Sequence, residues 1–188
     1  TVTFIGDKII KQTCDNRFIK IRTYRATDQC GNFTECQQEI TVFNDTPPSI
    51  TCPLDITVEC ADEVPLAKPD GLSGTSSCGG EVTFTFGGDV ISDQTCANRF
   101  IVTRTYIATD ECGNFTSCNQ MIVVSDTTAP QIKFIDPLLQ GVGDTVFLGL
   151  NGQDPKTVVP PFNENSVITK DNCNGNVVID FQLVLISA

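Results

Sequence analysis

The chain has 188 residues and a formal net charge of −11 at pH 7, with 12 Lys and Arg against 23 Asp and Glu. A negative field of this size repels phosphate backbones, so nucleic acid is disfavoured as a partner. The sequence has no histidine and its ten cysteines form no CxxC pair, which disfavours zinc binding and favours a disulfide framework made in an oxidising compartment.

Residues 14–43 and 96–125 are two copies of one segment. They read CDNRFIKIRTYRATDQCGNFTECQQEITVF and CANRFIVTRTYIATDECGNFTSCNQMIVVS, with most positions identical when Cys14 is aligned with Cys96 and no gap is introduced. A repeat of this length corresponds to one small domain, so the chain is predicted to be an array of modules. We expect the C-terminal half of a module at 1–46, a complete module at 47–128, and the N-terminal part of a divergent module at 129–188.

The joints between modules are predicted at two proline-containing segments, NDTPPSI at 44–50 and SDTTAPQI at 125–132. Each follows a strand-like run, and proline ends strands and stiffens linkers. No apolar run approaches the length of a membrane-spanning helix and no export signal is recognisable, so the sequence is interpreted as part of a longer secreted polypeptide without a membrane span.

Short runs rich in Thr, Val, Ile and Phe are predicted to be strands, and no segment has a helical period. In chain order these runs are Glu39–Phe43, Asp55–Cys60, Glu81–Phe86, Phe100–Ala108 and Asn119–Ser125. Short strands separated by turn residues indicate an all-β, antiparallel β-sandwich. Lys20 and Arg25 of the first copy stand where the second has Val102 and Ile107, so one sheet face is expected to be only partly covered.

Three motifs mark these segments: DTPPSI or DTTAP at the joints, the following TCPLDITVEC, and ATDECGNFTSCNQMIVV near the module end. In these motifs the segments resemble hyalin-repeat (HYR) modules. With its RTYxATDxCGN pattern the chain is most similar to the HYR-like modules of very large surface proteins of gliding and biofilm-forming Bacteroidetes. The resemblance covers 47–128 throughout and the first module from Thr13, but in the third only DNCNGNVVIDF (171–181) aligns, with SSCGGEVTFTF (76–86).

The resemblance implies tandem immunoglobulin-like sandwiches that are exported and act as adhesins or surface filaments. On this basis the chain is expected to be a stalk segment of a large extracellular, cell-surface protein that supports attachment or gliding. Its partners would be neighbouring modules of the same chain, with a surface or polysaccharide ligand bound by other domains. Two alternatives stay open: a filament subunit assembled by strand complementation, and a polysaccharide-binding module that uses the loop Ala61–Ser77.

Sandwich topology suggests a disulfide pairing for the six cysteines of residues 47–128. If the opening strand lies parallel to the last one, the pairs are Cys52–Cys118, Cys60–Cys96 and Cys78–Cys112. A rival pairs Cys112 with Cys118 across the GNFTS turn, because the five-residue turn between them permits a bridge. By the same scheme Cys14, Cys30 and Cys36 need partners from a preceding half-module, and Cys173 needs one downstream, supplied by a longer polypeptide or by a second chain.

Catalysis is not expected, because no histidine can act as base and the acidic residues gather at turns and joints. The sequence predicts no cofactor, and Ca²⁺ is the one metal that stays a candidate. Its candidate ligands are Asp28 and Asp110 in the DxCGN turns and Asp45 and Asp126 at the joints, although turn hydrogen bonding alone explains these residues.

Two further motifs have a structural and a functional interpretation. Thr127 and Thr145 lie in short acidic-Thr motifs of the kind that Bacteroidetes O-glycosylate on exported proteins. Arg22 and Arg104 precede Thr-Tyr in the two copies and are expected to lie along the sheet with the head group paired to an acid, rather than to bind a ligand.

Overall fold

A computed structural model describes residues 1–134, 167–174 and 177–179. The described part contains strands, turns and two 3₁₀ turns but no α-helix. The sheet within residues 2–43 and the strand pair formed by 131–134 and 167–170 are antiparallel. The all-β, disulfide-linked class predicted from the sequence is therefore confirmed. The chain forms two compact units: one contains Thr1–Ile56, Pro65–Ser92 and Ile101–Val123, and the other Thr57–Val64, Asp93–Phe100 and Val124–Ala188.

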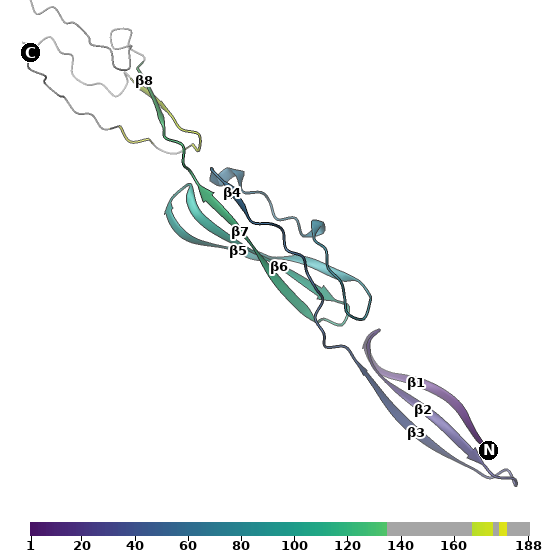
Figure 1. The fold of residues 1–188 in the computed structure, drawn as a ribbon. Coiled ribbons are helices and arrows are strands. Elements are labelled where there is room, and N and C mark those ends of the chain that lie inside the picture. Colours follow the sequence, from purple (N-terminus) through teal and green to yellow (C-terminus); the bar gives the residue numbers. More distant parts are fainter. Residues whose placement is uncertain (135–166, 175–176, 180–188) are drawn as a thin grey trace, which may run out of the picture. The chain divides into compact units, whose positions relative to one another are not determined.

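In the first unit, β1 (Val2–Cys14), β2 (Arg17–Thr27) and β3 (Phe33–Phe43) form a three-stranded antiparallel sheet in that order. Figure 1 shows the three strands alongside one another. The register is regular between β2 and β3, from Arg17 opposite Phe43 to Thr27 opposite Phe33. The β1–β2 pairing shifts at two places, after Phe4 and after Ile10, which is the signature of β-bulges that bend a strand.

The DxCGN motif builds the turn between β2 and β3, and its second copy builds the turn between β6 (Arg99–Asp110) and β7 (Phe115–Ser125). The Asp28 carboxylate accepts hydrogen bonds from the backbone N–H groups of Cys30 and Asn32, each at 2.9 Å. Asp110 accepts the same two bonds from Cys112 and Asn114, also at 2.9 Å. Each turn needs one residue at positive φ, which glycine supplies: φ is 88° at Gly31 and 81° at the equivalent glycine.

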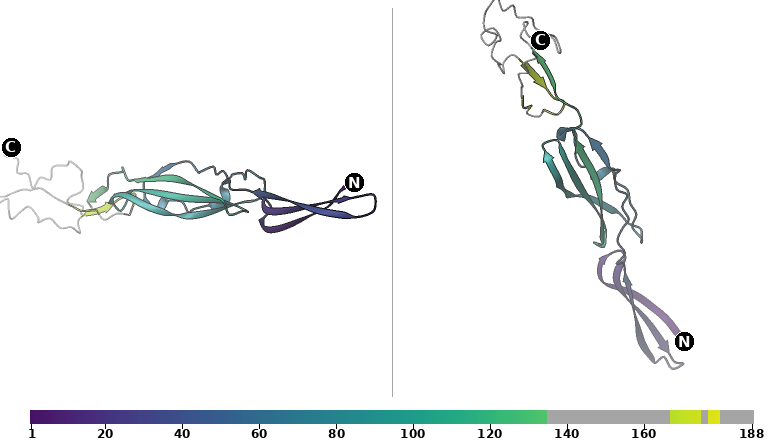
Figure 2. Two further views of the ribbon diagram at one scale, coloured as in Figure 1. Left: turned by 90° about the horizontal axis from the view of Figure 1, so that it is seen from below. Right: turned by 60° about the vertical axis from the view of Figure 1, so that its left-hand side comes forward.

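The second copy contributes to a four-stranded sheet in the order β4 (Ile56–Val58), β7, β6, β5 (Val82–Cys96). The views in Figure 2 agree that β5, β6 and β7 lie side by side. β6 alternates strictly between buried and half-buried residues from Phe100 to Asp110, as expected for a strand with one covered face. The strand predicted at Asp55–Cys60 is shorter in the structure and covers Ile56–Val58. The strand predicted at Glu81–Phe86 is longer and reaches Cys96.

In the first unit, residues 47–55 and 65–81 cover β5 and β6 and are called the cover below. They form irregular chain rather than a regular second sheet. It contains the 3₁₀ turn Pro69–Gly71 and one isolated bridge between Thr51 and Ser73. Gly74 packs so closely that an added Cβ would overlap the Ser49 carbonyl oxygen and lie 3.2 Å from the Phe84 ring. Backbone hydrogen bonds between Ser49 and Thr75 and between Thr51 and Ser73 hold the two sides of this cover together.

In the second unit, β8 (Gln131–Phe134) pairs with β9 (Val167–Lys170) in an antiparallel ladder. The 3₁₀ turn Ala61–Glu63 belongs to the same unit. Val142–Leu150, whose sequence fits either a strand pair or a long insertion, lies outside the described residues.

The two copies differ in how much of the sheet is covered. In the second copy Ala108 and Ile122 are fully buried and Tyr106 is 3 % exposed. Their equivalents one repeat earlier, Tyr24, Ala26 and Ile40, are half-buried or exposed. These three positions carry the same residue types in both copies, so the covering segment causes the difference in burial.

Candidate functional site

Three disulfides form the most distinctive chemical feature of the described residues. Cys52 is bonded to Cys118 with a Cα–Cα distance of 5.8 Å. This is the pair expected from a first strand lying beside the last, and the hydrogen bond from the Gln120 side chain to the Leu54 carbonyl (2.7 Å) holds the same two segments together. The bridge ties the covering segment to β7.

The structure differs from the predicted pairing at Cys60, which is bonded to Cys173 rather than to Cys96, with a Cα–Cα distance of 5.0 Å. The reason lies in Asn98. Its Oδ1 accepts a hydrogen bond from the Ala61 N–H (2.9 Å), and its Nδ2 donates to the Cys173 carbonyl (3.0 Å). One buried side chain therefore brings together the backbone on either side of this bridge.

The second difference is at Cys112, which is bonded to Cys14 and not to Cys78, with a Cα–Cα distance of 5.2 Å. The rival Cys112–Cys118 pair does not form either, because Cys118 is bonded to Cys52. The cause is Arg17, whose Nη1 donates to the Cys112 carbonyl (3.0 Å) and holds the turn of the second copy against the end of the first.

Arg17 is the centre of the first joint, which we define as Asn16, Arg17, Asn44, Asp110 and Asn114 together with the Cys14–Cys112 bridge. The Arg17 Nη2 donates to the Asn44 carbonyl (2.6 Å) and to Asn114 Oδ1 (3.0 Å). The Asn44 side chain in turn donates to Asp110 Oδ2 (3.3 Å). Asn16 Nδ2 donates to the Cys78 carbonyl at 3.5 Å.

The Asp110 carboxyl is buried in this joint. Burial, the largest single influence, raises the pKa of Asp110. The hydrogen bonds from the side chain and backbone of Asn114 and from the Cys112 N–H, with the charge of Arg17, together outweigh burial, so the pKa lies below its ordinary value. The carboxylate therefore stays ionised and clamps its own turn.

The second joint repeats two of these contacts one repeat later. Arg99, equivalent to Arg17, donates from Nη2 to the Asp126 carbonyl at 2.9 Å. Asn98 contacts the Cys173 carbonyl as Asn16 contacts that of Cys78. Glu59 is an additional anchor. Its carboxylate accepts from three side chains: Thr127 (3.0 Å), Thr128 (2.8 Å) and Asn172 (2.7 Å).

The hydrogen bond from Thr128, followed by that from Thr127, holds the pKa of Glu59 below its ordinary value. A carboxylate with three donors is best satisfied when ionised. The second joint therefore combines one disulfide with one anionic anchor.

The predicted calcium ligands are not brought together. The Asp28 and Asp110 carboxylates accept hydrogen bonds within their own turns, and those from the side chain and backbone of Asn32 lower the pKa of Asp28. Asp126 accepts a hydrogen bond from the Thr128 N–H (3.0 Å). In the first copy the equivalent bond, from the Thr46 N–H, is accepted by Asn44 and not by Asp45. Across residues 1–134 and the short described stretches after 166, no three His, Cys, Asp or Glu side chains form a metal-binding group.

Of the two predicted glycosylation residues, only Thr127 lies in the described part of the chain. Thr127 is exposed, and its hydroxyl donates to Glu59. Thr145 lies outside the described residues. The O-glycosylation of both stays a prediction.

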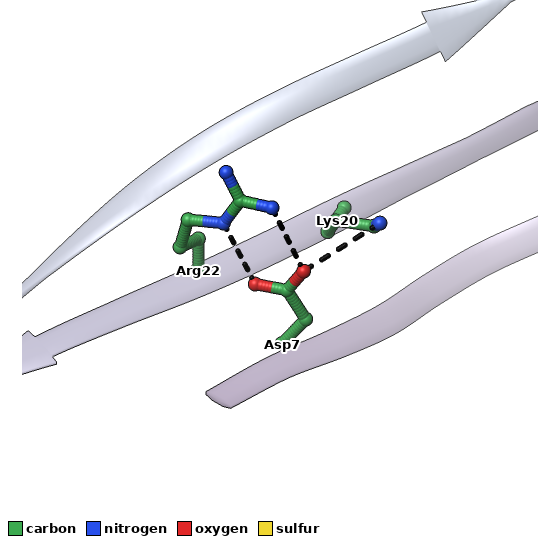
Figure 3. A network of polar contacts seen from close by, with 3 residues as sticks. All are labelled: Asp7, Lys20 and Arg22. Atoms are coloured by element: carbon green, nitrogen blue, oxygen red, sulfur yellow. Dashed lines mark hydrogen bonds and ion pairs between the residues drawn. The ribbon is translucent and has the colours of Figure 1, made fainter. Parts of the chain in front are cut away.

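The structural interpretation of the two arginines is confirmed. Arg104 Nε and Nη2 donate to the two oxygens of Asp89, both at 2.8 Å, and Nη1 donates to the Pro65 carbonyl at 2.7 Å. Figure 3 shows the same fork in the first copy, where Arg22 faces Asp7 and Lys20 Nζ lies 3.5 Å from it. The Arg22 side chain lowers the pKa of Asp7.

Sequence reasoning missed the joint residues Asn16, Arg17 and Asn44. A signal was present, because Asn-Arg-Phe occurs in both copies shortly after a cysteine, at Asn16-Arg17 and Asn98-Arg99. Glu59 had no such signal, since its three donors come from distant parts of the sequence.

Neither the protein-family models nor the curated proteins compared with this sequence match it. Within the described part of the chain there is no helix that is both long and apolar enough to cross a membrane. The function is therefore argued from the repeated joints and their disulfides.

Proposed function

We propose that this chain is a stalk segment of a large exported cell-surface protein, an adhesin or surface filament that serves attachment or gliding. The observation that carries the proposal is the order of the three disulfides along the chain. Each bridge joins parts of the sequence far apart, with separations of 98, 66 and 113 residues. Their arrangement determines how tension would pass through the chain.

The bridges form a continuous covalent relay. From Cys14 it crosses to Cys112, follows the backbone to Cys118, crosses to Cys52, follows the backbone to Cys60 and crosses to Cys173. Its two backbone parts, 112–118 and 52–60, are a small fraction of the sequence between Cys14 and Cys173. Tension on the ends would therefore pass through the relay, and the strands between would carry little of it.

Other features fit a stalk. Three disulfides are typical of proteins that mature in an oxidising compartment, which supports an exported location. A four-stranded sheet with a covering segment tied to it by Cys52–Cys118 suits an immunoglobulin-like module. The joints are held by an arginine, an asparagine and a disulfide rather than by a free linker.

Single-molecule pulling of the 188-residue chain from its two ends tests the relay. Without reductant we expect the stretch from Cys14 to Cys173 to extend only as far as the two short backbone parts of the relay allow. Addition of reductant should release the rest of this stretch and lengthen the pulled chain by about 500 Å, at roughly 3.5 Å for each residue released. Equal extension with and without reductant would remove the support for a tension-bearing stalk.

Labelling of intact cells with an antibody against residues 1–134 tests the location. Surface staining of unpermeabilised cells is expected, and staining only after permeabilisation would contradict the proposal. Electrophoresis of the native polypeptide then separates the two architectures. A large polypeptide little changed by reductant fits a stalk, and a ladder that collapses to 20.4 kDa on reduction fits a polymer of separate chains.

A further inference from the structure

The sheet of β1, β2 and β3 has one face that lacks the cover found in the second copy. Val124 is 1 % exposed and Gln120 is 6 % exposed in β7, whereas the equivalent Val42 is half-buried and Gln38 is exposed in β3. A hollow of about 230 Å³ lies on this sheet, lined in part by Phe18 and Val42, which are paired across β2 and β3. Uncovered apolar positions at such regular places indicate a missing packing partner.

The side chains that bond to the backbone of residues 47–82 in the second copy are present in the first copy. In the second copy, Gln120 donates a hydrogen bond to the Leu54 carbonyl and Arg104 donates one to the Pro65 carbonyl. Asn98 accepts a hydrogen bond from the Ala61 N–H. The equivalent residues are Gln38, Arg22 and Asn16. Arg22 already has the orientation that Arg104 uses, because it forms the same two bonds to an aspartate (Figure 3).

The free cysteines indicate the same partner. Cys36 occupies the position of Cys118 in the repeat, and Cys118 is bonded to Cys52 of the cover. Cys78 is held by Asn16 as Cys173 is held by Asn98, and Cys173 is bonded to Cys60, which lies within residues 47–82. Both Cys36 and Cys78 are exposed and unbonded.

We propose that the β1–β3 sheet binds a further segment with the sequence pattern of residues 47–82, which forms disulfides to Cys36 and Cys78 through its two equivalents of Cys52 and Cys60. The first joint is then closed by two bridges, Cys14–Cys112 and the new bond to Cys78. This structure contains the Cys14–Cys112 bridge at the first joint. At the second joint it contains Cys60–Cys173, which is the equivalent of the proposed bond to Cys78.

The segment must be an additional one. This chain's own residues 47–82 are tied to β7 by Cys52–Cys118 and to the second joint by Cys60–Cys173. A second molecule of the same chain holds its segment in the same way, so it cannot donate that segment without breaking two bonds. The inference concerns how the array is linked and does not depend on whether the array serves adhesion.

Each new bridge forms from two thiols, which together lose two protons and two electrons. A small-molecule disulfide such as oxidised glutathione accepts them and is reduced to two thiols. The attacking species is the thiolate, and both cysteines are exposed to such an oxidant.

The test is an extended chain in which a second copy of residues 47–82 is joined directly before Thr1, with the whole of the present chain retained. Both chains are refolded in oxidised and reduced glutathione, blocked with N-ethylmaleimide and digested without reduction for mass spectrometry. In the extended chain we expect bonds from the added Cys52 to Cys36 and from the added Cys60 to Cys78. Labelling of Cys36 and Cys78 should fall about tenfold, since a bonded sulfur is not a nucleophile.

Cys30 and Cys96 provide the internal control. Their repeat equivalents, Cys112 and Cys14, bond to each other across a joint between two repeats. The extension adds no further joint of that kind, so Cys30 and Cys96 gain no partner. Both should stay labelled in both chains. In the extended chain with Cys60→Ser in the added copy only, Cys78 should become labelled again while Cys36 stays bonded. Unchanged labelling of Cys36 and of the Cys78 of the present chain would overturn the proposal, as would a bond between the added copies of Cys52 and Cys60.

Discussion

Arg104 and Arg22 make the same ion pair in two environments, which allows one prediction to be worked out in detail. The side chains of Arg104 and Asp89 are 5 % and 31 % exposed, and Arg104 also donates to the Pro65 carbonyl. The side chains of Arg22 and Asp7 are 34 % and 24 % exposed. The matched substitutions Arg104→Met and Arg22→Met remove the same charge and similar volume.

The burial of the two pairs determines the expected loss. Removal of one partner from a buried pair destabilises by about 3–5 kcal/mol, and because Asp89 keeps partial hydration we expect about 2–3 kcal/mol for Arg104→Met. A solvent-screened pair contributes little to stability, so Arg22→Met should change it far less than Arg104→Met. A loss of about 2 kcal/mol at Arg104 corresponds to a roughly 30-fold change in the opening equilibrium.

The assay is native-state hydrogen exchange with mass spectrometry, since peptides from β6 and β2 report the two sites separately. Protection of β6 should fall strongly in Arg104→Met, and protection of β2 should change little in Arg22→Met. Equal losses, within about 0.5 kcal/mol, would refute the reasoning that the cover gives this ion pair its strength.

Three further predictions follow from the joints and the cover. Cys52→Ser opens a link that spans 66 residues and should lower the free energy of unfolding measured in urea by about 4 kcal/mol; a loss below about 1 kcal/mol would contradict the cover's dependence on this bridge. Gly74→Ala should destabilise by about 1–3 kcal/mol because of the clash with Ser49, whereas Gly71→Ala, with nothing within 4 Å of the added Cβ, should have little effect by thermal melting. The lowered pKa of Asp110 contributes stability above its ordinary value of 3.8, and this contribution is lost as pH falls through the folded-state pKa. Asp110→Asn should therefore be less stable at pH 7, with the gap to the parent chain closing below about pH 4; a gap that widens there would contradict the assignment.

The strands and turns could be predicted because their signals are local. The strand at Phe100–Ala108 and the Asp-x-Cys-Gly-Asn turns depend on residues close in sequence, and both appear as expected. The Cys52–Cys118 pair followed from placing the opening segment beside the last strand.

The other two bridges could not be derived in this way, because the prediction assumed that each module satisfies its own cysteines. The contacts that decide the pairing, Arg17 with Cys112 and Asn98 with Cys173, join residues 95 and 75 positions apart. Their geometry depends on how one repeat meets the next, which a sequence period does not specify. The recurrence of Asn-Arg after Cys14 and Cys96 marked the joint residues without revealing their partners.

Disulfide mapping of the 188-residue chain tests the central claim most directly. After thiol blocking and digestion without reduction, we expect peptides that link Cys14 to Cys112, Cys52 to Cys118 and Cys60 to Cys173. Cys30, Cys36, Cys78 and Cys96 should carry the blocking group. A map with Cys60 bonded to Cys96 and Cys112 bonded to Cys78 would confine the bridges to one repeat, and the covalent relay would not exist.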